Sequence, residues 1–282
     1  MPLTSYICQT CGVQHAPSEH PPADCAICLD PRQYVGRQGQ QWTTLQELRA
    51  SHHVIFTPDE RDERVVVVRT VPEFAIGQNA YILRTPKGNV MWDCQSLIDQ
   101  GAIDYIQSIG GLKAIVISHP HFYDSCVEWS QALGNIPIYI SAADKQWIMR
   151  PDPQRIVLWE GDTLSLLDGE VTVVRCGGHF DGSCVLIWHR GNNPCAFSAD
   201  TVMVAADRHH VSFMWSYPNY VPLSPDAVRG VWIALRSFAF EEIFGIRGDP
   251  IREGGRRIVL ESAKRYIKFE GYVGDAIEIE VA

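Results

Sequence analysis

Two histidines one residue apart follow an apolar run near the middle of the chain. His119 and His121 lie in the sequence SHPHFYD, directly after an apolar run at 112–117 that predicts a buried strand. Two imidazoles at the end of a strand can bind one metal ion, and zinc needs further ligands to complete its shell. His179 and Asp200 each follow an apolar segment of their own. The sequence therefore predicts that these four side chains form a metal site at one edge of a sheet, in a metal-dependent enzyme.

Two C-x-x-C pairs stand near the N-terminus and supply Cys8, Cys11, Cys25 and Cys28. Four thiolates at this spacing can close a tetrahedron around one ion, and the segment has too little apolar content to fold alone. The run YICQTCG, with the later pair, resembles the knuckles of rubredoxins and zinc ribbons. We expect one structural zinc here, with iron as the alternative, because four thiolates suit both metals. His15 and His20 lie between the pairs and are expected to be surface loop residues.

Length and composition limit the classes of function. A chain of 282 residues can bury one large core with room for a small appendage. No apolar run approaches the ~20 residues of a membrane span, and the start MPLT shows no signal-peptide pattern. The net charge of −9, without a basic cluster, predicts no nucleic-acid partner. The five cysteines outside the pairs are scattered among apolar residues, which indicates a reducing compartment. We therefore expect a cytoplasmic protein with no membrane partner, and a homodimer is the candidate oligomeric state.

The chain is predicted to consist of two modules. Residues 1–44 form the ribbon with its four cysteines, and residues 45–282 form the larger module. In the larger module the run VVVV predicts a strand, and NAYIL and NVMW around PKG predict a hairpin. Helices are expected at 96–109, 126–133, 142–149, 225–238 and 256–269. Because β-rich and helical stretches alternate twice, we expect two sheets packed together with helices outside.

The run from Asn79 to about Tyr266 resembles the metallo-β-lactamase superfamily. NAYI and the following Trp92–Asp93 are similar to the first hairpin of that family, whose aspartate supports the metal loops. HPH is similar to the start of the H-x-H-x-D-H motif, GHFDGS to the G-H-x-x-G-S loop, and SADT to the G-D-T loop. The resemblance implies an α/β (α+β) fold, a four-layer αβ/βα sandwich preceded by the small rubredoxin-like ribbon.

The sequence also departs from the family pattern. Aligned without a gap, the H-x-H-x-D-H motif places Tyr123 at the aspartate of the second metal and Asp124 at a histidine. The late strand that should lead to the last metal histidine continues as FGIRGD, without a histidine. The first metal site is therefore expected to be whole, and the second to have lost most of its ligands.

Roles for the residues near the metal follow as hypotheses. One zinc with three nitrogen ligands and one carboxylate can lower the pKa of a bound water to ~7 and polarise a carbonyl. Asp124 could orient that water, act as general base, hold a weak second metal with Asp200, or cap the helix that starts near Cys126. Tyr123 could donate to a developing oxyanion or simply pack. Asp93 would accept a hydrogen bond from a ligand imidazole and fix its tautomer.

Other interpretations stay open for four sets of residues. The paired histidines could bond to backbone alone, and Asp200 could only cap a turn. His209 and His210 could line the substrate mouth, replace the missing metal histidine or belong to an exposed loop. Arg247 could contact an anionic substrate or pair with a carboxylate.

The leading function is a zinc hydrolase with one active-site metal that acts on a small ester, thioester or lactone, in the manner of glyoxalase-type relatives. The alternative from another class is a non-catalytic scaffold that keeps one metal after losing the second. A redox protein that uses iron in the knuckle, as in flavodiiron relatives, is the third hypothesis. It is the weakest hypothesis, because flavodiiron relatives need a dinuclear site rich in carboxylate ligands, and the motifs of this chain do not supply one.

Overall fold

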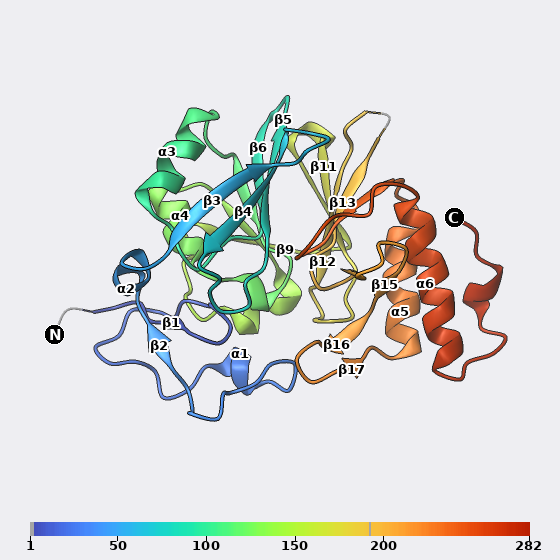
Figure 1. The fold of residues 1–282 in the computed structure, drawn as a ribbon, viewed down its shortest axis with the longest axis horizontal. Helices are drawn as coiled ribbons and strands as arrows, with labels where there is room; N and C mark the ends of the chain where they lie inside the picture. The colour runs from blue at the N-terminus through green and yellow to red at the C-terminus, as the bar shows by residue number, and fades with distance from the viewer. Residues whose placement is uncertain (1–2, 192) are drawn as a thin grey trace. The chain divides into compact units, whose positions relative to one another are not determined.

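The computed structural model describes residues 3–191 and 193–282. The chain forms two compact units, Met1–Trp159 and Glu160–Ala282, and each contains one large sheet with helices packed on it (Figure 1). Within the described ranges, no helix is long and apolar enough to cross a lipid bilayer.

The first unit is built on a seven-stranded sheet with the strand order β3-β4-β5-β6-β7-β8-β9. The strands are β3 (His53–Pro58), β4 (Val65–Val71), β5 (Ala80–Thr85), β6 (Gly88–Trp92), β7 (Ala114–Val116), β8 (Ile138–Ser141) and β9 (Ile156–Trp159). Strands β3 to β6 are antiparallel, whereas β6 to β9 are parallel. Trp92 and Val116 are partners in the register of β6 and β7. Because parallel strands run in the same direction, the residues after Trp92 and Val116 leave the same edge of the sheet side by side.

Three α-helices and two 3-10 helices accompany this sheet. They are α2 (Leu45–Arg49), α3 (Gln100–Ser108), α4 (Cys126–Ala132), η1 (Pro120–Phe122) and η2 (Ala142–Trp147). The helix expected at 142–149 is the 3-10 helix η2, which ends at Trp147 and is followed by extended Ile148. The Asp144 carbonyl accepts the hydroxyl of Tyr123 at 3.2 Å, and the Ile148 N–H bonds Lys145 instead. The Asp144 carbonyl therefore does not accept the Ile148 N–H, as it would in an α-helix.

The N-terminal segment is part of the first unit. Its elements are short: β1 (Ile7–Cys8) pairs with β2 (Trp42–Thr43), and α1 (Ala26–Leu29) spans one turn. The Ala16 N–H donates to the carbonyl of Met149 at 3.0 Å, far along the same unit. The module boundary at 44/45 stays a prediction, since the compact units divide elsewhere in the chain.

The second unit is built on a five-stranded sheet with the order β10-β11-β12-β13-β18. These strands are β10 (Thr163–Leu166), β11 (Val171–Arg175), β12 (Cys184–Trp188), β13 (Cys195–Phe197) and β18 (Glu242–Phe244). Two small ribbons pair β14 (Met203–Val204) with β15 (Val211–Ser212) and β16 (Met214–Ser216) with β17 (Val221–Pro222). The helices are η3 (Leu167–Gly169), α5 (Pro225–Leu235), α6 (Gly255–Phe269) and η4 (Ala276–Ile279).

The core of the second unit joins one face of this sheet to both long helices. Val185 and Ile187, two residues apart on β12, share a face and pack in one apolar cluster with Trp232 of α5 and Val259 of α6. The helices α5 and α6 run beside one another in Figure 1. The two helices therefore cover this face of the sheet.

Candidate metal centres

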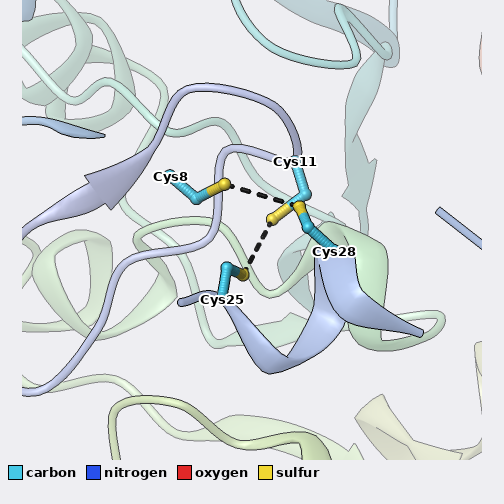
Figure 2. A group of neighbouring side chains, drawn as sticks. All are labelled: Cys8, Cys11, Cys25 and Cys28. Carbon is cyan, nitrogen blue, oxygen red and sulfur yellow. Dashed lines mark hydrogen bonds between the residues drawn. The ribbon is translucent and has the colours of Figure 1, made fainter. Parts of the chain in front are cut away.

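The four N-terminal cysteines converge on one point, as Figure 2 shows. All four are buried, and their sulfur atoms all lie within 4.8 Å of one another. The Sγ atoms of Cys8 and Cys28 are 3.5 Å apart, and those of Cys11 and Cys25 are 3.7 Å apart. Bonds of about 2.3 Å from a tetrahedral metal would separate neighbouring sulfurs by about 3.8 Å. The four side chains therefore fit a tetrathiolate site.

The backbone around these cysteines is folded to hold them. Gly12 has φ +84°, a conformation that favours glycine, and its N–H donates to the Cys8 carbonyl at 2.9 Å. Cys28 lies on α1, whose first turn is closed by a bond from Leu29 N–H to the Cys25 carbonyl. Hydrogen bonding within the sulfur cluster lowers the pKa of the Cys8 thiol to about 6, and Gln40 Nε2 donates to its sulfur at 3.2 Å. A thiolate, the form that binds metal, is thus supported at Cys8.

One expectation about this segment is wrong. His15 is not a surface loop residue: it is buried, and its ring stands edge-on to Trp42 with centroids 4.7 Å apart. The backbone places it there, because the His15 N–H donates to the carbonyl of Tyr6, next to β1. His20 is exposed, as expected.

In the first unit, His119 and His121 follow β7, with His121 on the 3-10 helix η1. Both are 2% exposed, and their ring centroids are 5.2 Å apart. The hydroxyl of Ser118 lies 2.8 Å from His119 Nδ1, so Nε2 is the nitrogen of that ring that a metal would contact. Phe122 packs against the His119 ring at 4.4 Å between centroids. The two imidazoles are therefore held in a dry setting on a tight turn.

Asp93 holds the start of this loop from the neighbouring strand. It follows β6 with φ +58°, and its N–H donates to the Val116 carbonyl at 2.8 Å. Its Oδ1 accepts the N–H of Ser118 at 2.8 Å, and its side chain is buried. Asp93 thus fixes the backbone next to His119. The bond to an imidazole that the sequence suggested stays a prediction.

Asp124 and Tyr123 make contacts within the first unit. The Asp124 carboxyl is buried and accepts hydrogen bonds from Ser96 Oγ and Gln78 Nε2, each at 2.5 Å. Burial raises the pKa of this carboxyl to about 8 against the effect of those bonds. The residue that precedes α4 is Ser125, and no side chain caps the helix there. Tyr123 donates its hydroxyl to Asp144, as described above.

In the second unit, His179 and Asp200 point at each other. His179 Nε2 lies 3.7 Å from Asp200 Oδ2, and both side chains are buried. A metal bound about 2.0–2.1 Å from each atom would hold them about 3.4 Å apart. The Met214 carbonyl accepts from His179 Nδ1 at 3.1 Å, so Nε2 is the nitrogen that faces the carboxylate. This pair therefore has the orientation of two ligands of one ion.

The loop that carries Asp200 is tied down on both sides. Ser198 Oγ donates to the Val202 carbonyl at 2.6 Å, and Thr201 Oγ1 donates to the Cys184 carbonyl at 3.2 Å. Ala199 has φ +45°, which marks the sharp turn between β13 and Asp200. Tyr217 donates its hydroxyl to the backbone carbonyl of Asp200 at 3.0 Å.

Several supporting residues were not found from the sequence. Ser118 stands next to His119 and could have been suspected, and Tyr217 lies in the aromatic-rich run VSFMWSYP. Met214 acts through its backbone carbonyl, which no residue type signals.

His209 is exposed, and His210 bonds Asp207 at 2.5 Å, which lowers the pKa of that carboxyl to about 2. The exposed-loop interpretation of the histidine pair fits these contacts.

Residues 75–228, more than half of the chain, match the metallo-beta-lactamase superfamily. The chain is 42% identical over 265 residues to YmaE of Bacillus subtilis (strain 168), a protein described as uncharacterized; the match covers 93% of this chain and 96% of YmaE. Among solved structures, DIM-1 metallo-beta-lactamase matches with a TM-score of 0.58 at 15% identity, over 77% of this chain and all of that one. VMB-1 matches with a TM-score of 0.56 at 14% identity, over 76% of this chain and 98% of that one.

The structures show the likeness of the fold, and the match along the chain shows the family. The expected fold is confirmed: a mixed α+β sandwich with several sheets and a cysteine cluster near the N-terminus. With the motifs in family order and the loops at strand ends, the chain belongs to the metallo-β-lactamase superfamily.

Proposed function

We propose that the protein is a hydrolase of a small ester, thioester or lactone that uses one zinc ion held by His119, His121, His179 and Asp200. All four side chains are buried, and each is of a type that binds zinc. The pair His179 and Asp200 carries the proposal, because a buried nitrogen and a buried carboxylate oxygen that face each other have the geometry of two ligands of one cation. When bound, such an ion polarises a carbonyl and lowers the pKa of water.

The chain's own residues would tune this chemistry by holding the ligands. The Met214 carbonyl orients the His179 ring, and the Ser118 hydroxyl does the same for His119. Partners of this kind fix the tautomer and raise the basicity of a ligating imidazole. The roles of Asp124 as general base and of Tyr123 as oxyanion donor stay predictions, and the polar atoms of both side chains also make hydrogen bonds inside the first unit.

The proposal is tested first by elemental analysis of metal per chain, purified without chelator. We expect two zinc ions in the wild type and one in the double variant His119→Ala/His121→Ala. The matched control is His209→Ala/His210→Ala, which removes two adjacent histidines from the exposed loop and should keep both ions. One ion in the wild type and in the His119/His121 variant would leave the candidate site empty and favour the scaffold hypothesis.

Activity is the second test. A panel of small esters, thioesters and lactones is presented to the same three proteins. Turnover that is lost in the His119/His121 variant and kept in the His209/His210 control supports a hydrolase that depends on this site. Two bound ions without turnover of any member of the panel would favour a scaffold that only binds metal.

A further inference from the structure

The segment that carries the four cysteines (residues 7–43, the knuckle) contacts Asp124. Asp124 ends the loop that carries His119 and His121 (residues 118–124, the histidine loop). The Gln14 N–H donates to the Asp124 carbonyl at 2.9 Å. A methyl group added to Gly12 would lie 2.3 Å from Ser96 Oγ and 2.6 Å from Asp124 Oδ1, distances that Cβ atoms do not adopt. Gly12 directly follows Cys11, so the backbone of the tetrathiolate site packs against the buried carboxyl of Asp124.

Asp124 is also the point where the histidine loop is anchored. It lies three residues after His121, with φ +42°. Ser96 and Gln78 bond its two carboxyl oxygens from elsewhere in the unit. The short turns from His119 to Tyr123 are closed by bonds from Phe122 N–H to His119 and from Tyr123 N–H to Pro120. A displacement of Asp124 would therefore move the loop that carries both imidazoles.

We expect the knuckle to depend on its metal for shape. Its regular elements are two residues of β1, two of β2 and four of α1. Segments with so little secondary structure are held by the ion, and the free energy of metal binding is then free energy of folding. Loss of the ion would release Gly12 and Gln14 from their contacts with Asp124.

We propose that the tetrathiolate knuckle is a clamp, which holds Gly12 and Gln14 against Asp124 and so positions the loop of His119 and His121. Asp124 is then a positioning residue. The consequence for metal binding at those histidines rests on the proposed function, whereas the clamp itself does not. In this arrangement the ion bound by the four cysteines takes no part in the reaction, but it controls the geometry of the site at His119 and His121.

The test compares Gly12→Ala with Gly39→Ala. Both glycines belong to the N-terminal segment and have similar positive φ, +84° and +79°, but nothing lies within 4 Å of a methyl group at Gly39. Both variants therefore place an alanine at a positive φ, but only the methyl group of Gly12→Ala collides with Ser96 and Asp124. The deciding measurement is hydrogen–deuterium exchange of residues 117–126 in the zinc-loaded, full-length proteins. We expect faster exchange there in Gly12→Ala and wild-type exchange in Gly39→Ala.

A second readout follows the metals by cobalt substitution. Cobalt bound to thiolates has a charge-transfer absorption that cobalt bound to histidine and carboxylate lacks. Gly12→Ala should weaken cobalt binding at the histidine site about 10- to 100-fold, the usual effect of disturbing groups that support a ligand. The double variant Gly12→Ala/Ser96→Ala removes the oxygen nearest to the new methyl and should recover part of that loss. General destabilisation would give no such recovery.

The possible outcomes separate the clamp from the proposed function. If exchange of 117–126 in Gly12→Ala equals that in Gly39→Ala, the clamp is overturned, whatever happens at the cysteines. If Gly12→Ala loses the thiolate absorption as well, faster exchange in the loop still supports the clamp. If the wild type binds no metal at the histidines, the proposed function fails, and the exchange comparison alone decides on the clamp.

Discussion

Among single residues, Asp124 should give the protein a measurable pH dependence of stability. Burial raises the pKa of its carboxyl to about 8, whereas an aspartate in an unfolded chain titrates at ~3.9. Between these values the folded chain holds a proton that the unfolded chain releases. The free energy of unfolding therefore falls as pH rises from about 4 to about 8.

The substitution Asp124→Asn should remove this slope, because the amide does not titrate and asparagine tolerates the positive φ of this position. Relative to wild type, the variant should gain up to about 1.4 kcal/mol of stability per pH unit over this range. Urea unfolding of both proteins at about pH 5, 6.5 and 8, with saturating zinc, measures the difference. Parallel stability curves for the two proteins would mean that Asp124 is ionised throughout and that its burial costs little.

The clustering of the four cysteines and the closeness of His119 and His121 were predictable because their spacing is local. C-x-x-C and H-x-H place two ligands within one turn of chain, so the sequence itself brings each pair together. The contacts of Asp124 are different, because Gln78 is 46 positions away and Gly12 is farther still. Nothing in the run SHPHFYD indicates such partners. The burial of His15 escaped prediction for the same reason, since it depends on packing against Trp42.

At the scale of elements, one side chain joins α3 to the edge strand β3. Asp99 Oδ1 accepts the Ala102 N–H at 2.8 Å and caps α3, while Oδ2 accepts the Val54 N–H at 2.9 Å. Asp99→Ala should lower the free energy of unfolding by about 2–3 kcal/mol, the sum of a lost cap and an unsatisfied N–H. Asp99→Asn keeps the capping oxygen and should lose only about 1 kcal/mol.

Urea unfolding measures both effects, and Ser224→Ala provides the matched control. Ser224 caps α5 through a bond to Ala227 N–H alone, so its loss should cost about 1 kcal/mol. Equal losses for Asp99→Ala and Ser224→Ala would show that the bond to β3 contributes nothing. A large loss for Asp99→Asn would show instead that the charge of Asp99 is the important feature.

The long elements were predictable and the short ones were not. Helices expected at 225–238 and 256–269 are α5 (Pro225–Leu235) and α6 (Gly255–Phe269), where apolar periodicity extends over several turns. Strand β3 and the ribbons of β14 to β17 lie in stretches whose course the sequence left open. They contain two to six residues each, too few for a periodic signal, and their pairing partners determine them.

At the scale of the whole molecule, the superfamily match leaves the first 74 residues unexplained, although the longer match to YmaE covers most of them. The knuckle therefore lies outside the part of the chain that matches the superfamily. Its packing on the histidine loop within the first unit gives the knuckle a purpose that its own sequence does not reveal.

The nine cysteines allow the knuckle to be examined in the intact molecule. All nine are free thiols; eight are buried and Cys176 is half-buried. Burial raises the pKa values of Cys94, Cys126 and Cys176 above the ordinary range, so these groups hold little thiolate near neutral pH. Only the thiolate reacts with a disulfide reagent. In the metal-loaded protein we therefore expect slow reaction at every cysteine.

Removal of metal by a chelator, without denaturant, should release four fast-reacting thiols, because the knuckle loses the ion that holds it. The measurement is a titration with an aromatic disulfide near neutral pH, before and after chelation, with urea to expose all nine. His119→Ala/His121→Ala should behave like the wild type, since it leaves the four cysteines intact. Metal loss that exposes no thiol would show that the knuckle folds without its ion. The clamp would then be permanent and could not respond to the supply of metal.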